Sequence, residues 1–263
     1  MLYVDQHADY YNTPIDCALV RLRYQIQYGY IAKQLSKYAV KFWGVTPWRV
    51  DYLQKVYGVK SEKTDLLVMG GDEKYVDWEN RMVIRNDIRC KYSIPDDGFL
   101  IITGGKIDRA KNIHLLMEAV VGLKERKVFL LVFGNLIEEM EIYCTPLIGE
   151  NVKFVGWLDS KTVYPYFLAA DLAVFPGTHS VLWEQAMSCG IPGIFKDWDG
   201  GFSHIDCGGN ALLLKDISAD ILACEIAKLV KDTQRYEEMK SVAENVARKE
   251  FSYIEIAKRA IGL

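Results

Sequence analysis

The sequence contains no long apolar run and no dense basic cluster, and each absence excludes a class of protein. No apolar stretch approaches the roughly 18 residues of a membrane-spanning helix. Met1 leads into a strand-like Leu-Tyr-Val followed at once by Asp5, so we expect no signal peptide. The net charge is −3 and there is no basic tail, so we expect no nucleic-acid partner.

Cysteine pairs with metal-ligand spacing are also absent. Six cysteines occur singly, and none forms a C-x-x-C pair: Cys17, Cys90, Cys144, Cys189, Cys207 and Cys224. Neither His114 nor His179 stands at metal-ligand spacing from a cysteine. We therefore expect buried, reduced thiols in a cytosolic protein, and no metal site.

Half of the 263 residues are apolar, enough to build one large domain or two small ones. Strand-like and helix-like segments alternate, which is typical of an α/β fold with a parallel sheet. The break at residues 93–98 contains Pro95 and Gly98. Before it, strands are expected at 2–5, 38–45 and 65–69, and helices at 15–37 and 48–57. After it, about six strands are expected, at 99–103, 127–133, 152–155, 172–175, 191–195 and 211–214. The intervening helices are expected at 113–126, 159–170, 180–188, 217–230, 233–249 and 252–261. The second run is long enough for one complete doubly wound domain.

Ligands of open parallel sheets bind beyond the carboxyl ends of the strands, so those ends are the places to search. The first candidate is the loop Gly104-Gly105-Lys106, with Lys111 five residues further on. Glycines allow a backbone to approach a phosphate closely, and two lysines at this spacing can converge on a diphosphate. The alternative is a plain tight turn with solvated lysines.

The second candidate is Gly156-Trp157, after the strand at 152–155. A flat nucleobase could lie against this loop and bond to its backbone groups. The alternative interpretation places the Trp157 ring in the core.

The third candidate is the strand-turn-helix segment at 172–192. Thr178 or His179 would lie near the helix N-cap, and the first free backbone N–H groups of a helix bind anions. One turn further on, the Glu184 carboxylate could accept hydrogen bonds from sugar hydroxyls. The alternative is an ordinary strand-turn-helix with a solvated glutamate. Taken together, the three strand ends offer a diphosphate clamp, a base shelf and a ribose acceptor.

Residues from about 63 to 263 resemble the C-terminal, nucleotide-sugar-binding domain of GT-B glycosyltransferases of family 4, the retaining group 1 enzymes. The resemblance lies in the order and spacing of five segments. These are L-L-V-M-G-G-D from residue 65, G-G-K-I-D-R-A-K-N at 104–112, N-V-K-F-V-G-W-L at 151–158, A-A-D-L-A-V-F-P at 169–176 and W-E-Q-A-M-S-C-G-I-P at 183–192.

The resemblance implies roles for individual residues. Lys106 and Lys111 match the positions that hold the diphosphate, with a lysine where arginine is commoner in the family. Glu184 matches the second glutamate of a paired motif and would hold the ribose. The first glutamate, which usually contacts the donor sugar, would fall on Pro176 and is missing. Backbone amides that touch the phosphates match His179, Ser180 and Val181.

Residues 1–62 resemble the last strands and helices of the N-terminal, acceptor-side domain. His7 matches a histidine that lies near the transferred sugar in the family, although a loop histidine satisfied by water is the alternative. We expect three parts: a partial acceptor-side domain at 1–62, a nucleotide-sugar-binding domain at 63–250, and a C-terminal helix at 251–263 that packs back on the first part. The first strands of the acceptor-side domain have no counterpart, so the chain is expected to be a fragment, a protein with a misassigned start, or a shortened form.

The resemblance implies a transferase that moves a sugar from a nucleoside-diphosphate sugar to a glycan or lipid-linked acceptor, with retention. Lys106, Lys111 and the helix start would stabilise the leaving diphosphate without a metal, and the nucleotide sugar is a substrate rather than a cofactor. The implied pathway is polysaccharide assembly in the cytoplasm, at the inner face of a membrane with at most peripheral contact. Two alternatives stay open: a nucleotide-sugar epimerase on the same architecture, and a non-catalytic nucleotide-sugar-binding domain. The oligomeric state is not predicted.

Overall fold

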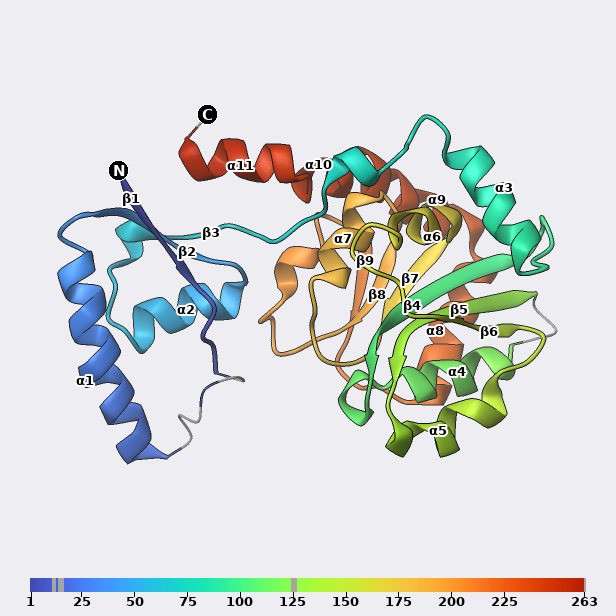
Figure 1. Ribbon diagram of the computed structural model, residues 1–263, viewed down its shortest axis with the longest axis horizontal. Helices are drawn as coiled ribbons and strands as arrows, with labels where there is room; N and C mark the ends of the chain where they lie inside the picture. Colours follow the sequence, from blue (N-terminus) through green and yellow to red (C-terminus); the bar gives the residue numbers. More distant parts are fainter. Residues whose placement is uncertain (11–12, 14–16, 124–126, 263) are drawn as a thin grey trace. The chain divides into compact units, whose positions relative to one another are not determined.

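The computed structural model describes residues 1–10, 13, 17–123 and 127–262, which form two compact units. Unit 1 comprises residues 1–69, 198–204 and 258–263, and unit 2 comprises residues 70–197 and 205–257. Figure 1 follows the chain from β1 in blue to α11 in red. Each unit contains its own parallel sheet, in agreement with the expected α/β class.

Unit 1 has a three-stranded parallel sheet in the order β1-β2-β3. Its strands are β1 (Leu2–Gln6), β2 (Ala39–Gly44) and β3 (Thr64–Leu66), and its helices are α1 (Ala18–Leu35) and α2 (Pro47–Lys55). Thr46 caps α2 by accepting a hydrogen bond from the Arg49 backbone, and Pro47 occupies the first turn as expected. The start of the predicted helix 15–37 lies outside the described residues. A small apolar core around Phe42 and Leu53 joins the helices to the sheet.

Unit 2 has a six-stranded parallel sheet in the order β6-β5-β4-β7-β8-β9. Its strands are β4 (Phe99–Ile107), β5 (Val128–Leu136), β6 (Val152–Gly156), β7 (Leu172–Phe175), β8 (Gly193–Lys196) and β9 (Ala211–Leu214). All six predicted strands are present. The order reverses between β4 and β7, because the chain builds outward from β4 in one direction and then in the other. Doubly wound sheets bind ligands beyond the carboxyl ends of the strands at this reversal.

The helices that follow β3 are α3 (Arg81–Lys91), α4 (Ile113–Val121), α5 (Glu138–Cys144), α6 (Tyr164–Ala169), α7 (Leu182–Ser188), α8 (Ala219–Lys231), α9 (Thr233–Val242), α10 (Arg248–Glu250) and α11 (Tyr253–Ile261). The predicted helix 113–126 ends at Val121, and residues 124–126 lie outside the described residues. The predicted helix 159–170 is shorter, because the Asp159 carboxylate accepts bonds from the backbone of Lys161 and Thr162 and forms a turn instead. Pro165 does not interrupt α6 but lies in its first turn.

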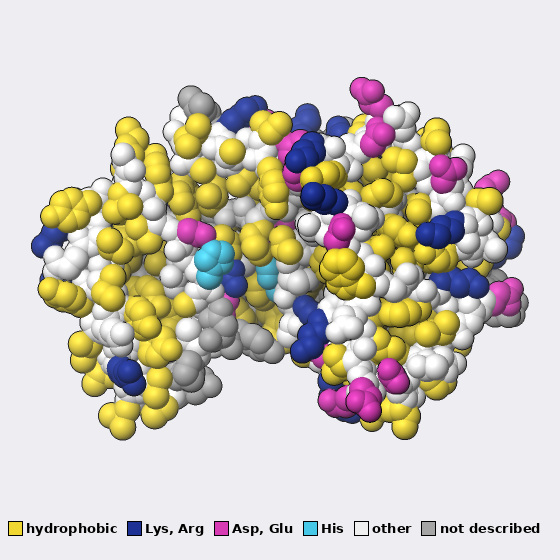
Figure 2. All heavy atoms as spheres, viewed as in Figure 1, with side chains coloured by type: hydrophobic (Ala, Val, Ile, Leu, Met, Phe, Trp, Pro, Cys, Tyr) yellow, Lys and Arg dark blue, Asp and Glu magenta, His cyan; other side chains and the backbone are white. Residues whose placement is uncertain are grey.

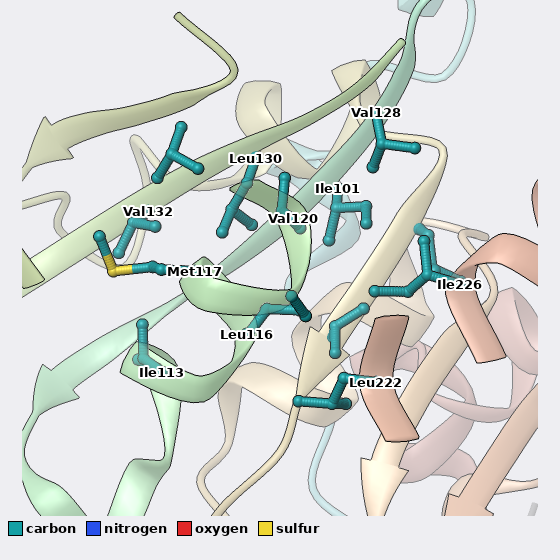
Figure 3. Close-up of a cluster of buried hydrophobic side chains, with 14 of the residues drawn as sticks. Ile101, Ile113, Leu116, Met117, Val120, Val128, Leu130, Val132, Leu222 and Ile226 are labelled. Atoms are coloured by element: carbon teal, nitrogen blue, oxygen red, sulfur yellow. The ribbon is translucent and has the colours of Figure 1, made fainter. Parts of the chain in front are cut away.

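One face of the unit 2 sheet carries a large apolar core. Figure 3 shows Ile101, Leu130 and Val132 from β4 and β5 meeting Leu116 of α4 and Ile226 of α8. These side chains are almost completely buried, as expected for parallel strands covered by helices.

Asp171, just before β7, ties α3 to the amino end of the sheet. Its carboxylate lies 2.6 Å from Arg85 Nη2 and 2.7 Å from Arg89 Nη2, and it also accepts from the Leu100 backbone at 2.7 Å. The Arg89 side chain is only 3% exposed, so this is a buried network. It lies at the end of the strands opposite to the predicted site.

Within the described ranges, no helix is both long and apolar enough to cross a membrane. Cys144 and Cys189 are buried as expected, but Cys17, Cys90 and Cys224 are exposed, so the expectation of buried thiols is wrong for those three.

Candidate functional site

The glycines after the first strand of unit 2 belong to the strand and not to a loop, which corrects the sequence expectation. β4 continues to Ile107, and Gly104 and Gly105 pair with Phe133 and Gly134 of β5. Gly105 and Gly134 have φ values of +118° and +124°. A Cβ on Gly134 would lie 1.8 Å from the Gly105 carbonyl oxygen, so a side chain cannot be accommodated there. The glycine pair therefore allows the two strand ends to run side by side to the edge of the sheet.

A tight turn leads from β4 into α4. The Asp108 carboxylate accepts a hydrogen bond from the Lys111 backbone at 3.2 Å. Asn112 follows in a left-handed conformation, with φ of 53°, and its side-chain amide donates to the Pro176 carbonyl at 3.1 Å. The sequence reasoning missed both residues. Their residue types could have indicated the turn. Asp side chains often accept a backbone N–H a few residues further on, and Asn is one of the few residue types that adopts the left-handed conformation readily.

The β4–α4 turn is bound directly to the β7–α7 turn. Thr178 donates its backbone N–H to the Ala110 carbonyl at 3.0 Å. A Cβ on Gly177 would lie 2.3 Å from the same Ala110 oxygen, so only glycine permits this approach. Lys111 Nζ lies 2.5 Å from the Thr178 carbonyl and 3.2 Å from the His179 carbonyl. The structure thus brings together Lys111 and His179, which the sequence placed in two separate candidate loops.

The two predicted lysines have different environments. Burial lowers the pKa of the Lys111 ammonium, and its two carbonyl contacts use two of its three donors. One N–H of Lys111 is therefore left for a further acceptor. Lys106, in contrast, is 66% exposed, and its Nζ lies 3.7 Å from the Asp108 carboxylate. Its side chain can turn towards a ligand at little energetic cost, because an exposed ion pair of this kind is weak.

Helix α7 begins two residues later than expected. Its N-cap is Val181, which makes no side-chain cap, so neither Thr178 nor His179 caps the helix as predicted. The backbone of Trp183 bonds to the Ser180 carbonyl, and that of Gln185 bonds to the Val181 carbonyl. Among the described residues, the N–H groups of Ser180 and Val181 find no hydrogen-bond acceptor. Two neighbouring backbone donors thus follow directly after the carbonyls that hold Lys111.

Glu184, the predicted ribose acceptor, is completely buried. The alternative of a solvated glutamate is therefore wrong. Its Oε1 lies 2.8 Å from His179 Nε2, and the His179 side chain is itself only 8% exposed. His179 also packs edge-on against the Trp183 ring, with 5.0 Å between the ring centroids. A ribose that reaches this carboxylate must displace or rotate the His179 ring, or use the second carboxylate oxygen.

Two predicted residues of unit 2, Gly156 and Trp157, stand away from this cluster. Trp157 follows β6, the strand at the outer edge of the sheet, and is 71% exposed. The interpretation of Trp157 as a core residue is therefore wrong. Gly156 has a φ of +86°, which turns the chain sharply at the strand end. His7 belongs to unit 1, where its Nε2 lies 2.7 Å from Asp5 Oδ2. The roles of all three residues stay predictions.

Comparison with known proteins assigns the family. The family model "Glycosyl transferases group 1" matches residues 84–246, which is more than half of the chain. The chain belongs to this family. A lipopolysaccharide core biosynthesis glycosyltransferase, LpsE of Rhizobium meliloti, is 26% identical over 148 residues, which cover 55% of this chain and 43% of that protein. D-inositol 3-phosphate glycosyltransferase 1 of Catenulispora acidiphila is 24% identical over 207 residues, which cover 72% of this chain and 49% of that protein. The group 1 chain described here thus spans about half the length of the curated relatives it matches.

The fold agrees with this assignment. The crystal structure of Anabaena HepE in complex with UDP and glucose matches 99% of this chain and 70% of that chain, with a TM-score of 0.71 and 19% sequence identity. This likeness confirms the predicted GT-B type of fold for the group 1 chain.

Proposed function

We propose that this group 1 chain transfers a sugar from a nucleoside-diphosphate sugar to a glycan or lipid-linked acceptor, with retention at the transferred carbon. The observation that carries the proposal is the cluster at the sheet reversal. Lys111 Nζ lies against the carbonyls of Thr178 and His179, directly before the unpaired N–H groups of Ser180 and Val181. A half-buried cation beside two neighbouring backbone amide donors suits an oxyanion such as a diphosphate.

The same groups support catalysis as well as binding. When the glycosidic bond of the donor breaks, negative charge accumulates on the departing diphosphate. A fixed ammonium and fixed N–H groups stabilise that charge more than they stabilise the bound donor, because the charge on the bridging oxygen grows in the transition state. In this proposal Lys111 and Lys106 take the role that a metal ion has in other transferases, and no cofactor takes part.

The remaining predicted residues complete the donor site. Glu184 accepts from the ribose hydroxyls, and the backbone at Gly156-Trp157 supports the base. His7 of unit 1 lies near the transferred sugar. The transfer takes place in the cytoplasm, at the inner face of the membrane on which polysaccharides are assembled. HepE has been crystallised in complex with UDP and glucose and with UDP-glucose, which makes a uridine donor the first one to test here.

A second candidate function is a non-catalytic nucleotide-sugar-binding domain. It is favoured by Pro176, which stands where the family has the glutamate that contacts the donor sugar. Both candidates predict nucleotide binding, but only the first predicts turnover.

One experiment separates the two. The full chain is incubated with UDP-glucose, with and without a preparation of glycans and lipid-linked sugars, and free UDP is measured. A transferase releases UDP only in the presence of acceptor. Binding of UDP by calorimetry without acceptor-dependent release identifies the binding domain instead. If neither UDP nor another nucleoside diphosphate binds, the proposed site is wrong.

A further inference from the structure

A second cavity of unit 2 lies at the amino ends of the strands, opposite to the candidate nucleotide site. Its volume is about 270 Å³, close to the lower end of the range of about 300–1,000 Å³ that small-molecule pockets have. Helix α3 and the segment that begins as α9 line it, together with Leu168 and Ala170 near the end of α6. The buried connection between α7 and β8, at residues 189–192, also contributes. We name it the amino-end cavity.

The amino-end cavity has an excess of positive charge. Arg81 and Arg85 of α3 and Lys240 of α9 line it, but only two carboxylates do, those of Asp171 and Glu244. The lining therefore carries three cations against two anions, an excess of one charge. The face of unit 2 that Figure 2 shows has basic side chains, in dark blue, interspersed with acidic ones, in magenta. An uncompensated charge inside a concave site attracts a ligand of the opposite sign.

The carboxylates of the cavity are paired, whereas its arginines keep unused donors. Asp171 bonds to Arg85 at 2.6 Å, and Glu244 bonds to Arg81 at 2.8 Å. Arg85 also donates to the backbone carbonyl of Ala169 at 2.8 Å. An arginine has five N–H groups, so these contacts use two donors of Arg85 and one of Arg81. Both side chains are partly buried and line the cavity, so a ligand that enters it can meet the remaining donors.

Lys240 is the third cation and is held only loosely. In the part of the chain that the structure describes, its Nζ makes no hydrogen bond, and its ion pair with Glu237 spans 3.7 Å. The side chain is 36% exposed, and an ion pair of this kind is weak. Lys240 can therefore turn its ammonium towards an anion in the cavity without breaking a strong contact.

The segment that carries Glu244 is distorted where it borders the cavity. Residues Ala243–Ala247 form a π-helical turn, a rare local widening of a helix that is frequently found at functional sites. Trp78 also lines the cavity, and the guanidinium groups of Arg81 and Arg248 lie 4.1 Å and 4.2 Å from the centroid of its ring. The π-helical turn thus places Glu244 against Arg81 and is followed directly by Arg248 against Trp78. It shapes one end of the cavity, and this geometry is independent of the charge balance.

We infer that the amino-end cavity binds a small organic acid with a single carboxylate. One negative charge balances the excess charge of the lining, whereas a phosphate monoester carries about −1.5 to −2 at neutral pH and would exceed it. Planar guanidinium groups can bind a carboxylate through two parallel bonds. Met82, Leu168 and Pro192 offer apolar contacts to the body of the acid. This inference uses no residue of the nucleotide site, so each can fail without the other.

Ligand-observed NMR titration of the full chain tests the inference. The probes are benzoate and phenylacetate, their neutral counterparts benzamide and phenylacetamide, and phenyl phosphate as the counterpart of higher charge. We expect a carboxylate to bind about 10-fold more tightly than its amide, because the amide loses a charge-assisted bond. Phenyl phosphate should bind no more tightly than benzoate. If neither carboxylate binds, if the amides bind as well as the acids, or if phenyl phosphate binds more tightly than both acids, the inference is overturned.

Substitutions in the lining locate the bound acid. Lys240→Gln should weaken carboxylate binding about 10-fold and leave the melting temperature unchanged, because it removes the loosely held ammonium. Lys228→Gln is the matched control. Lys228 forms the same kind of i,i+3 ion pair with Glu225 on α8, so its loss should leave carboxylate binding unchanged. Wild-type binding by Lys240→Gln overturns the inference, as does equal weakening in the two variants.

Two further variants separate this cavity from other anion sites. Ala170 is buried in the lining, so Ala170→Leu fills part of the space and should abolish carboxylate binding in a protein that its melting transition shows to be folded. Lys111→Ala, in the candidate nucleotide site, should bind the carboxylates like the wild type. If Lys111→Ala loses carboxylate binding, the acid occupies the nucleotide site and the inference is overturned. Wild-type carboxylate binding by folded Ala170→Leu overturns it as well.

Discussion

The substitution Glu184→Gln separates the two roles that the structure gives to this glutamate. In the folded chain Glu184 is fully buried and its carboxylate meets His179 at 2.8 Å. Truncation to alanine removes this contact and leaves the nearly buried His179 ring facing an empty space. A hydrogen bond to a charged group contributes about 1.5–3 kcal/mol. For a domain of this size, Glu184→Ala should therefore melt about 3–12 °C below the wild type.

Glutamine keeps an oxygen and nearly the same volume at the position, so Glu184→Gln should cost about 1 kcal/mol of stability or less. Its effect on binding should be larger. A carboxylate can accept from both vicinal hydroxyls of a ribose, whereas the amide replaces one acceptor oxygen with a donor and loses the charge. Loss of one charge-assisted bond weakens nucleotide binding about 10-fold or more.

The assay is calorimetric titration of both proteins with a nucleoside diphosphate and with its 2′-deoxy analogue. The wild type should bind the ribonucleotide about 10-fold more tightly than the deoxy form, and Glu184→Gln should lose most of that preference. If the wild type and Glu184→Gln bind the two analogues alike, the ribose role of Glu184 is wrong. If Glu184→Ala has the same melting temperature as the wild type, the contact with His179 does not contribute to stability.

The remaining predictions concern the cation, the metal and the amino end of the sheet. Lys111→Ala should bind nucleoside diphosphates about 10- to 100-fold more weakly, while Lys127→Ala, at an exposed ion pair, binds normally; unchanged affinity in Lys111→Ala places the diphosphate elsewhere. Because burial lowers the pKa of Lys111, nucleotide affinity should fall as the pH rises towards the ordinary lysine value of 10.5, and Lys111→Arg should remove that fall. The lowered pKa has the opposite effect on folding. Neutral Lys111 is easier to bury than charged Lys111, so the free energy of unfolding should rise as the pH rises from the lowered pKa of Lys111 to the ordinary lysine value. Urea unfolding at several pH values would show this rise. Nucleotide binding should survive a chelator, and strict dependence on Mg²⁺ or Mn²⁺ would contradict the lysine account. Asp171→Ala leaves the buried Arg89 without its carboxylate partner and should lower the free energy of unfolding by about 3–5 kcal/mol. The nucleotide affinity of the folded protein should stay unchanged.

The sequence predicted the unit 2 sheet well because most of its strands are apolar runs, and those of β4, β5, β6 and β7 are followed directly by glycine or proline. It placed the ends of elements less well. Gly104 and Gly105 looked like a loop, since glycines usually interrupt strands, but Gly134 on the neighbouring strand lets the two backbones stay paired. The start of α7 was predicted two residues too early. Thr178 and His179 have suitable cap chemistry, but their carbonyls accept from Lys111 instead of from the first turn of the helix.

The candidate site was predictable in its location but not in its internal contacts. The rule that ligands bind at strand ends was enough to choose Lys111, His179 and Glu184 as neighbours of one ligand. It could not show that His179 and Glu184 contact each other, because burial depends on how the two turns pack. For the same reason, the exposure of Trp157 was not visible from a strand followed by Gly-Trp.

The four hydrogen bonds between the β4–α4 and β7–α7 turns have a consequence for the energetics of binding. These bonds run from Ala110, Lys111 and Asn112 on one turn to residues 176–179 on the other, and all of them are between groups of the protein itself. The two turns therefore form one preorganised receptor, and an arriving anion loses its own freedom but does not have to order the protein around it. Asn112 therefore contributes to affinity without contacting the anion. If its bond to Pro176 were removed, the two turns would have to be ordered on binding, and the lost conformational entropy would lower the affinity although every anion-binding group is still present.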